Sequence, residues 1–302
     1  MSTIQWYPGH MARAKRLVRE HIDLVDVVLE LIDARIPMAS RNPDIAQLIG
    51  SKPHLIILNK ADLADPLITE AWQKYFRTQK VANLAVATTN GLGLNRLPQL
   101  ANQLAAEALQ KWRSKGRRPR SARLMILGIP NVGKSTLINR LVGQKRLKVA
   151  DRAGVTRQQQ WVKLRGDLDL LDMPGILMPK IGDDRVGLKL AATGAISDEV
   201  YDLEYVARWL ASWLYENHEE AFCRRYNLDK SISDAEQLLL AIGASRGALV
   251  SGGKIDTKRA AWHLLDEFRD GRIGRFSLEM PVLPEDSDNN VEEEIVSDKE
   301  PE

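Results

Sequence analysis

The order of two nucleotide-binding motifs constrains the fold of this 302-residue chain more than any other feature of its sequence. GIPNVGKS, from Gly128 to Ser135, fits the phosphate-binding loop pattern and lies between an apolar run and a helical run, as that pattern requires. NKAD, from Asn59 to Asp62, fits a guanine-recognition motif. The usual GTPase order places the phosphate loop first, but here it comes about seventy residues later. Either one match is accidental or the chain has been cut and rejoined.

Apolar strand patterns alternate with helical patterns in the first part of the chain. This alternation predicts an α/β fold, namely a P-loop GTPase domain with a parallel-type sheet. When the sequence is read from Leu124, its motifs follow the usual GTPase order, which predicts a circularly permuted sheet. The original termini are then joined near the basic connector 111–123, because permutation is tolerated where termini lie close together. The strand patterns lie at 27–33, 54–58, 84–87, 123–127, 159–164 and 168–172, and the helical ones near 66–79, 93–112 and 134–141.

The sequence predicts three parts. Residues 1–184 form the circularly permuted GTP-binding domain, which starts with a basic helix at 8–24. From 185 to 284 the patterns are helical only, which predicts a smaller all-helical C-terminal domain. Residues 285–302 are strongly acidic and are expected to form a disordered tail. Three tryptophans of the helical domain are expected in its core rather than on a stacking surface: Trp209, Trp213 and Trp262.

The charge of the chain is unevenly distributed. The last eighteen residues hold nine acids against Lys299, a net charge of −8, so the rest of the chain carries +11 within a total of +3. Such a basic body favours a polyanion, with nucleic acid the obvious candidate, and the helical domain is the expected RNA-binding part. A basic surface that only keeps the protein soluble is the alternative.

Other bulk features exclude several classes of protein. No apolar run is long enough to span a membrane, and the N-terminal segment lacks the apolar stretch of a signal peptide, so we expect a cytoplasmic protein with no membrane partner. The single Cys223 excludes an internal disulfide framework and is expected in the core. No exposed heptad pattern is found, which favours a monomer.

The phosphate loop predicts contacts with a nucleotide and its metal ion. Gly128 and Gly133 allow the backbone to turn its N–H groups toward the β-phosphate. Lys134 supplies a positive charge at the β and γ oxygens, and the Ser135 hydroxyl is an expected ligand of Mg²⁺.

Two later segments complete the predicted Mg²⁺ site. In LDMPG, Asp172 follows an apolar strand and can hold Mg²⁺ through water, while the Gly175 N–H can contact the γ-phosphate. In RAGVTRQ, Thr156 is the expected second hydroxyl ligand. Taken alone, Thr156 would be an ordinary loop threonine, and its position between the phosphate loop and Asp172 is what favours the role.

NKAD predicts the base specificity. The Asp62 carboxylate can accept hydrogen bonds from guanine N1–H and N2–H₂, a pairing that adenine cannot offer, and such a site discriminates by roughly 10⁴-fold or more. Asn59 is expected at the purine edge and the Lys60 stem on the ring. NKAD alone could also be a helix cap, but both motifs predict the same ligand, GTP. The residues expected to bind the nucleotide are Asn59, Lys60, Asp62, Thr88, Thr89, Asn131, Val132, Gly133, Lys134, Ser135, Thr136 and Gly175.

With these residues in place, the chain resembles the circularly permuted ribosome-biogenesis GTPases of the YlqF/RbgA family. The resemblance covers nearly everything before the acidic tail and is specific at each motif. It implies a role in late maturation of the large ribosomal subunit, with GTP hydrolysis stimulated on the particle, and rRNA as a partner. The motifs that carry it are QWYPGHMARA, DARIPMASRNP, LNKADL, GIPNVGKSTLINRL, LDMPGIL and VSGGKID.

The catalytic step lacks a common residue. Many GTPases place Gln after the glycine of LDMPG to orient the attacking water, but this chain has Ile176. His10 of WYPGHM corresponds to the His proposed to position water in the similar family, while contact with RNA or a turn cap is its alternative role. Asn131 resembles the Asn that coordinates K⁺ in potassium-stimulated GTPases, although Asn is also a good turn residue. The expected catalytic residues are His10, Lys134, Thr156 and Gly175.

Two functions fit these expectations. The first is a GTPase assembly factor that binds the immature large ribosomal subunit and hydrolyses GTP to GDP, with Mg²⁺ and, at Asn131, K⁺ as cofactors. The second is a GTP-gated RNA-binding scaffold in which nucleotide occupancy, not hydrolysis, controls ribosome binding. Ile176 favours the scaffold, and His10 favours the assembly factor.

Overall fold

A six-stranded sheet forms the centre of the larger part of the molecule, with its strands in the order β3-β2-β1-β4-β6-β5. The structure, a computed structural model, describes residues 8–142, 161–171 and 183–282. Strand β1 pairs in parallel with β2 and β4, β2 with β3, and β4 with β6, whereas β5 is antiparallel to β6. The strands are β1 (Val27–Asp33), β2 (His54–Asn59), β3 (Ala82–Ala85), β4 (Ala122–Leu127), β5 (Trp161–Leu164) and β6 (Leu168–Leu171).

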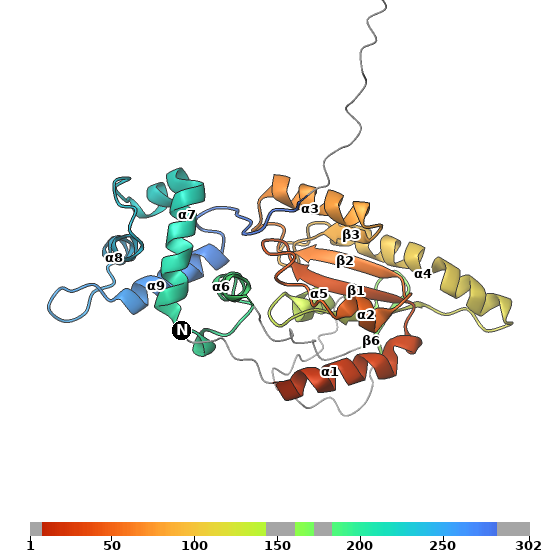
Figure 1. Cartoon of the computed structure of the whole chain (residues 1–302). Coiled ribbons are helices and arrows are strands. Elements are labelled where there is room, and N and C mark those ends of the chain that lie inside the picture. The colour runs from red at the N-terminus through yellow and green to blue at the C-terminus, as the bar shows by residue number, and fades with distance from the viewer. Residues whose placement is uncertain (1–7, 143–160, 172–182, 283–302) are drawn as a thin grey trace, which may run out of the picture.

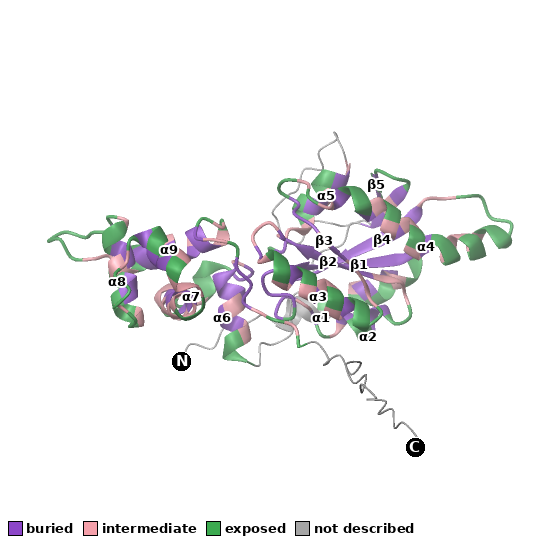
Figure 2. Cartoon of the chain, turned by 90° about the horizontal axis from the view of Figure 1, so that it is seen from above, coloured by how far each residue is buried: buried purple, intermediate pink, exposed green. Residues whose placement is uncertain are grey.

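Helices cover both faces of the sheet (Figure 2). On one face, α1 (Pro8–His21), α2 (Ile45–Ile49) and α3 (Pro66–Thr78) pack on the strands. On the other face lie α4 (Leu97–Ser114) and α5 (Lys134–Val142). All seven residues of β1 are buried. Val28 belongs to the core between the sheet and the helices of the first face, and Leu29 belongs to the core on the second face. Burial on both faces explains why this parallel strand is mostly apolar, and its two acids, Glu30 and Asp33, are paired with arginines.

A group of helices lies beside the sheet (Figure 1). It consists of α6 (Asp184–Ala192), α7 (Leu203–Tyr226), α8 (Ala235–Ser245) and α9 (Thr257–Arg269), which we call the helical part. Each of these helices begins after an aspartate whose carboxylate accepts a backbone N–H of the first turn, an arrangement that stabilises helix starts. These aspartates are Asp183, Asp202, Asp234 and Asp256. Short 3₁₀ turns occur at Ile22–Leu24, Leu94–Arg96 and Asp198–Val200.

After α9 the chain returns to the sheet (Figure 1). We call residues 271–280 the C-terminal strap. The backbone N–H of Phe276 donates to the carbonyl of Leu63 at 3.1 Å, and that of Leu278 to the carbonyl of Arg35 at 2.8 Å. The strap therefore joins the helical part to the loops that follow β1 and β2.

The predicted fold class is confirmed: an α/β sheet domain in permuted order is followed by helices. One edge pair, β5 and β6, is antiparallel because the turn between them is too short for a crossover. The third strand ends at Ala85, two residues earlier than expected, and the short α2 was not expected. No helix in the described ranges is both long and apolar enough to cross a membrane.

The expected core of the helical part is correct except at Trp262. Cys223 is buried, and Trp209 and Trp213 pack against the core. The side chain of Trp262 is 49% exposed, so its expected core position is wrong. The buried stripe of α9 runs through Ala261, Leu264 and Phe268, and Trp262 lies off that stripe.

Candidate GTP-binding site

A cavity of about 450 Å³ opens at the edge of the sheet where the carboxyl ends of β1, β2 and β4 meet. In open parallel sheets this is the edge at which ligands bind. The cavity brings the NKAD loop (59–62) together with the ATTN loop (87–90) and the phosphate loop (128–135). Its lining residues are Arg35, Asn59, Lys60, Asp62, Leu63, Thr88, Thr89, Asn131, Gly133, Thr136, Thr193, Arg269 and Asp270.

The phosphate loop is packed so closely that two of its positions require glycine. A Cβ atom at Gly128 would lie 2.5 Å from the carbonyl oxygen of Leu31 in β1. Gly133 has φ +98°, and a Cβ atom there would lie 2.3 Å from Nδ2 of Asn59. These glycines let the loop turn directly above the sheet edge.

Lys134 folds back over the phosphate loop. Its Nζ donates to the carbonyls of Gly128 at 3.0 Å and Ile129 at 2.5 Å. Burial lowers the pKa of Lys134 to about 8, because removal from water disfavours the charged ammonium. The oxygens of a phosphate group would restore the missing negative partner at this position.

Asn59 connects the three loops of the site. Its Nδ2 donates to the carbonyl of Val132 at 2.7 Å, and its Oδ1 accepts from the N–H of Thr88 at 3.1 Å. The side chains of Asn59 and Val132 are buried, at 1% and 0% exposure. The polar atoms of Asn59 thus fix the phosphate loop and the ATTN loop next to the NKAD loop.

Asp62 presents a carboxylate to the cavity. Its Oδ2 accepts from Thr89 Oγ1 at 3.0 Å and from Asn90 Nδ2 at 3.4 Å. The ATTN loop that carries these two donors is held in turn by Arg140 of α5, which donates to the carbonyls of Thr88 and Thr89. The carboxylate is therefore oriented by neighbours before any ligand arrives.

A buried charge network includes two lining residues of the cavity, Arg35 and Lys60. Asp33, at the end of β1, accepts from Arg35 Nε at 3.0 Å and Nη2 at 2.8 Å, and Lys60 Nζ lies 3.0 Å from its Oδ2. Burial alone would raise the pKa of Asp33, but the charges of Arg35 and Lys60 outweigh it and hold this pKa well below its usual range. Lys60 has φ +59°, a left-handed conformation uncommon outside glycine. Its ammonium is directed to Asp33.

The helical part contributes one wall of the cavity. Arg35 Nη2 donates to the carbonyl of Thr193 at 3.0 Å, and Asn131 Nδ2 donates to that of Gly194 at 3.1 Å. Arg269 of α9 donates to the carbonyl of Ala191 at 2.8 Å. The wall is therefore tied by hydrogen bonds to the phosphate loop and to the segment that follows β1.

Several predicted site residues lie outside the described residues. They are Thr156, Asp172 and Gly175, together with the side chain of His10, whose backbone belongs to the first turn of α1. Ser135 and Thr136 are exposed in the first turn of α5, next to Lys134. The described residues contain no group of three or more His, Cys, Asp or Glu that could hold a metal ion.

Comparisons with known proteins agree with this geometry. A family model described as "50S ribosome-binding GTPase" matches residues 123–213. A ribosome biogenesis GTPase A from Bacillus pumilus is 46% identical over 279 residues, which cover 92% of this chain and 99% of that protein. The chain belongs to the ribosome biogenesis GTPase A family.

More distant members of the ribosome biogenesis GTPase A family extend the comparison. The protein from Thermotoga maritima is 31% identical over 278 residues, which cover 92% of this chain and 95% of that protein. The crystal structure of GNP-bound YlqF from T. maritima has a TM-score of 0.62 at 27% identity, covering 89% of this chain and 98% of that one. A GDP-bound YlqF structure gives a TM-score of 0.60 at 28% identity. The fold is thus shared along nearly the whole chain.

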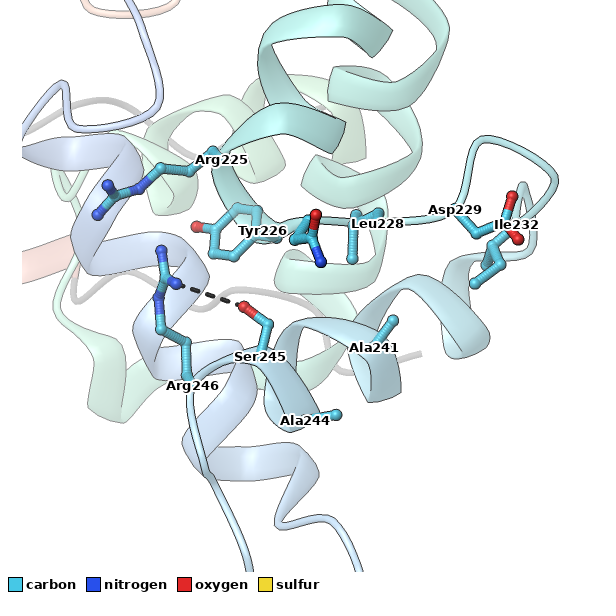
Figure 3. A pocket seen from close by; sticks show the side chains of 10 residues that line it. Arg225, Tyr226, Leu228, Asp229, Ile232, Ala241, Ala244, Ser245 and Arg246 are labelled. Carbon is cyan, nitrogen blue, oxygen red and sulfur yellow. Dashed lines mark hydrogen bonds between the residues drawn. The ribbon is translucent and has the colours of Figure 1, made fainter.

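The helical part of this ribosome biogenesis GTPase holds a second cavity, of about 520 Å³, between the end of α7 and α8 (Figure 3). Two arginines at its edge, Arg225 and Arg246, both donate to the carboxylate of Glu267. Arg246 also lies over the ring of Tyr226, 4.6 Å from its centroid. These arginines are already paired, and the described residues that line this cavity include no glycine, so the sheet-edge cavity is the better candidate for a nucleotide site.

Sequence reasoning missed several residues of the site in this family member. Asp33 and Arg35 belong to the DARIP segment, which follows a strand and contains an acid–base pair, a usable signal. Thr193, Arg269 and Asp270 carry no such signal, since their place at the cavity depends on how the helical part packs.

Proposed function

We propose that this member of the family binds the immature large ribosomal subunit in the cytoplasm and hydrolyses GTP during late maturation of that subunit. The cavity carries the proposal, since Asp62 of the NKAD loop and Thr136 after the phosphate loop line one space despite their reversed order. The description of the matching family model as a 50S ribosome-binding GTPase supports the choice of partner. The basic body of the chain supports phosphate contacts with rRNA, which we assign to residues 185–284.

In this proposal the guanine lies against Asp62 and the phosphates lie on the phosphate loop. Asp62 accepts from guanine N1–H and N2–H₂, with its carboxylate oriented by Thr89. Lys134 exchanges the carbonyls of the loop for β- and γ-phosphate oxygens. Asn59 supports the purine pocket through the loops it connects, because both of its polar atoms are engaged with backbone.

The donors around Ser135 fit Mg²⁺. A hydroxyl in the first turn of the helix after the phosphate loop, beside Lys134, is the arrangement that places an ion against β- and γ-phosphates. We assign Thr156 and Asp172 as its further ligands and the Gly175 N–H to the γ-phosphate. Bound Mg²⁺ would neutralise charge that develops on the phosphates during hydrolysis.

His10 and Asn131 are assigned to catalysis. His10 would orient the attacking water in place of the Gln that Ile176 replaces. A K⁺ ion at Asn131 would be held by Oδ1, because Nδ2 donates to Gly194, and it would add positive charge near the phosphates.

The alternative is a GTP-gated RNA-binding scaffold in which occupancy alone controls ribosome binding. Ile176 supports this alternative, because an isoleucine cannot orient water. In both functions the protein binds GTP, so the two differ only in whether turnover is used.

Turnover of GTP by the purified protein, alone and with isolated large ribosomal subunits, tests the proposal. Parallel reactions in K⁺ and Na⁺ buffers test the cation assignment. Strong stimulation by the subunit in K⁺ is expected, and His10→Ala should abolish that stimulation while GTP affinity is preserved. Tight GTP-dependent subunit binding without stimulated turnover would instead support the scaffold.

A further inference from the structure

The C-terminal strap holds the loop that carries Asp62. Arg275 donates from Nη2 to the carbonyl of Ala61 at 2.9 Å and from Nε to that of Ala64 at 3.0 Å. These two carbonyls lie on either side of Asp62 in the chain. One guanidinium group therefore spans the turn from which the guanine-binding carboxylate projects.

Three further contacts act on the same turn. The N–H of Phe276 donates to the carbonyl of Leu63 at 3.1 Å, and the N–H of Asp65 donates to Ser277 Oγ at 3.2 Å. Gly271, with φ +71°, lies so close to Leu63 that a Cβ atom would be 2.9 Å from Leu63 Cδ2. Each residue from 61 to 65 other than Asp62 thus contacts the strap.

We infer that the strap is a specificity element for guanine, and that Arg275 is the residue that positions Asp62. The inference rests on the proposed assignment of Asp62 to the guanine edge. Asp62 itself is held through one oxygen, by Thr89 and Asn90, so the direction of its carboxylate also depends on the backbone turn beneath it. Two hydrogen bonds to a base distinguish guanine from other bases only when the acceptor is correctly placed. The strength of a hydrogen bond falls steeply as the donor–hydrogen–acceptor angle departs from a straight line.

The strap also makes guanine recognition depend on the helical part. The ring of Phe276 lies 4.3 Å from that of His218 in α7, and it stacks on Phe268 of α9 at 6.4 Å. The backbone of the same residue bonds to Leu63. A displacement of the helical part would be transmitted to the turn around Asp62 through Phe276 and its neighbours in the strap.

Binding of GDP and IDP to the purified full chain tests the inference. IDP lacks the 2-amino group and can make only one of the two hydrogen bonds to Asp62, so the ratio of the two affinities reports the placement of the carboxylate. General destabilisation lowers both affinities by the same factor and leaves the ratio unchanged. Arg77→Ala, which removes an exposed arginine of α3 from the same surface, is the matched control.

We expect Arg275→Ala to lower the GDP-to-IDP ratio by at least about three-fold, as loss of an aligned hydrogen bond requires, and Arg77→Ala to leave it unchanged. An unchanged ratio in a folded Arg275→Ala variant would overturn the inference. If that variant does not fold, Arg275→Lys takes its place as the test. The lysine ammonium can reach only one of the two carbonyls at a time, so we expect a GDP-to-IDP ratio between that of the wild type and one about three-fold lower. An unchanged ratio would overturn the inference. A wild-type protein that does not prefer GDP to IDP would instead refute the assignment of Asp62.

Discussion

Nδ2 of Asn59 donates to the carbonyl oxygen of Val132 at 2.7 Å, across 73 residues of sequence. This bond joins the NKAD loop to the phosphate loop in a site where both side chains are buried. The two motifs that appear in reversed order along the chain are therefore adjacent in space. Permutation changed the chain order without separating the two halves of the site.

Asn59→Asp tests the importance of this bond. The substitution keeps the shape of the side chain but replaces the donor with a carboxylate oxygen that faces a carbonyl. We expect the free energy of unfolding to fall by about 3 kcal/mol, measured by urea denaturation. Asn102→Asp is the matched control, since the half-buried Asn102 donates to the carbonyl of Gly166 in a solvent-exposed hydrogen bond. This substitution should lower the free energy of unfolding by less than about 1 kcal/mol. Equal losses in the two variants would contradict the structural role of Asn59.

The lowered pKa of Lys134 predicts how nucleotide affinity depends on pH. Below its pKa of about 8 the ammonium is charged before binding, so GDP affinity should be constant there. Above pH 8 the free protein loses this proton while the phosphate-bound form keeps it, so affinity should fall by up to about ten-fold per pH unit. Titration of GDP between pH 7 and 9.5 checks this expectation.

Lys134→Ala is the control for that titration. It removes the titrating group, so its weaker affinity should not show the additional fall above pH 8. Ionisation of guanine at high pH affects both proteins alike and cancels in the comparison. A parallel decline in both proteins would mean that Lys134 does not titrate in this range.

Arg35→Leu should remove the guanidinium from the buried Asp33 and leave it the Lys60 ammonium and the backbone N–H of residue 35. We expect a loss of about 3–5 kcal/mol in the free energy of unfolding at pH 7, because an incompletely paired buried charge is costly. In the wild-type protein the stability contributed by the paired Asp33 carboxylate is fully present above the pKa of an unfolded Asp, about 3.9. This stability is lost as the pH falls toward the lower pKa of Asp33 in the folded state. The difference between the two proteins should therefore be constant from pH 7 to about 5 and shrink below about 4.

Urea denaturation at several pH values measures this difference. Arg77→Leu is the control, since it removes an arginine from the exposed surface of α3. A loss for Arg35→Leu no greater than for Arg77→Leu, or one independent of pH down to 3, would exclude the proposed network.

Asp62→Asn should change the base preference. The NH₂ group of Asn can donate to the C2 carbonyl of xanthine. With guanine, the same NH₂ group replaces one of the two carboxylate oxygens that accept from N1–H and N2–H₂. We expect GDP affinity to fall by about 100-fold or more and XDP affinity to rise, measured by competition binding. Asp65→Asn, whose parent carboxylate caps α3, should retain the preference for GDP. Unaltered base preference in Asp62→Asn would place guanine elsewhere.

The parts of the site that could be predicted from sequence are those with local patterns. Lys134 and Gly133 belong to a loop whose chemistry requires fixed spacing, and Asp62 follows an apolar strand at the expected edge. The direct purine contacts expected of Asn59 and Lys60 stay predictions. In the structure the polar atoms of these two residues contact Val132, Thr88 and Asp33. Those contacts depend on how the loops pack, which the local sequence does not indicate. Trp262 was misplaced for a similar reason: its helical pattern did not indicate which face of α9 the neighbouring helices would cover.

The strand order has a consequence for the chain as it is synthesised from its N-terminus. Strands β1, β2 and β3 emerge first and can pair with one another, but β1 lies next to β4, which spans residues 122–127. Until that segment appears, one edge of β1 has unpaired N–H and C=O groups between two apolar faces, the kind of edge that pairs with other chains. The nascent protein thus carries its NKAD loop on an incomplete sheet, and that edge must stay protected while α4 and the basic connector are being synthesised.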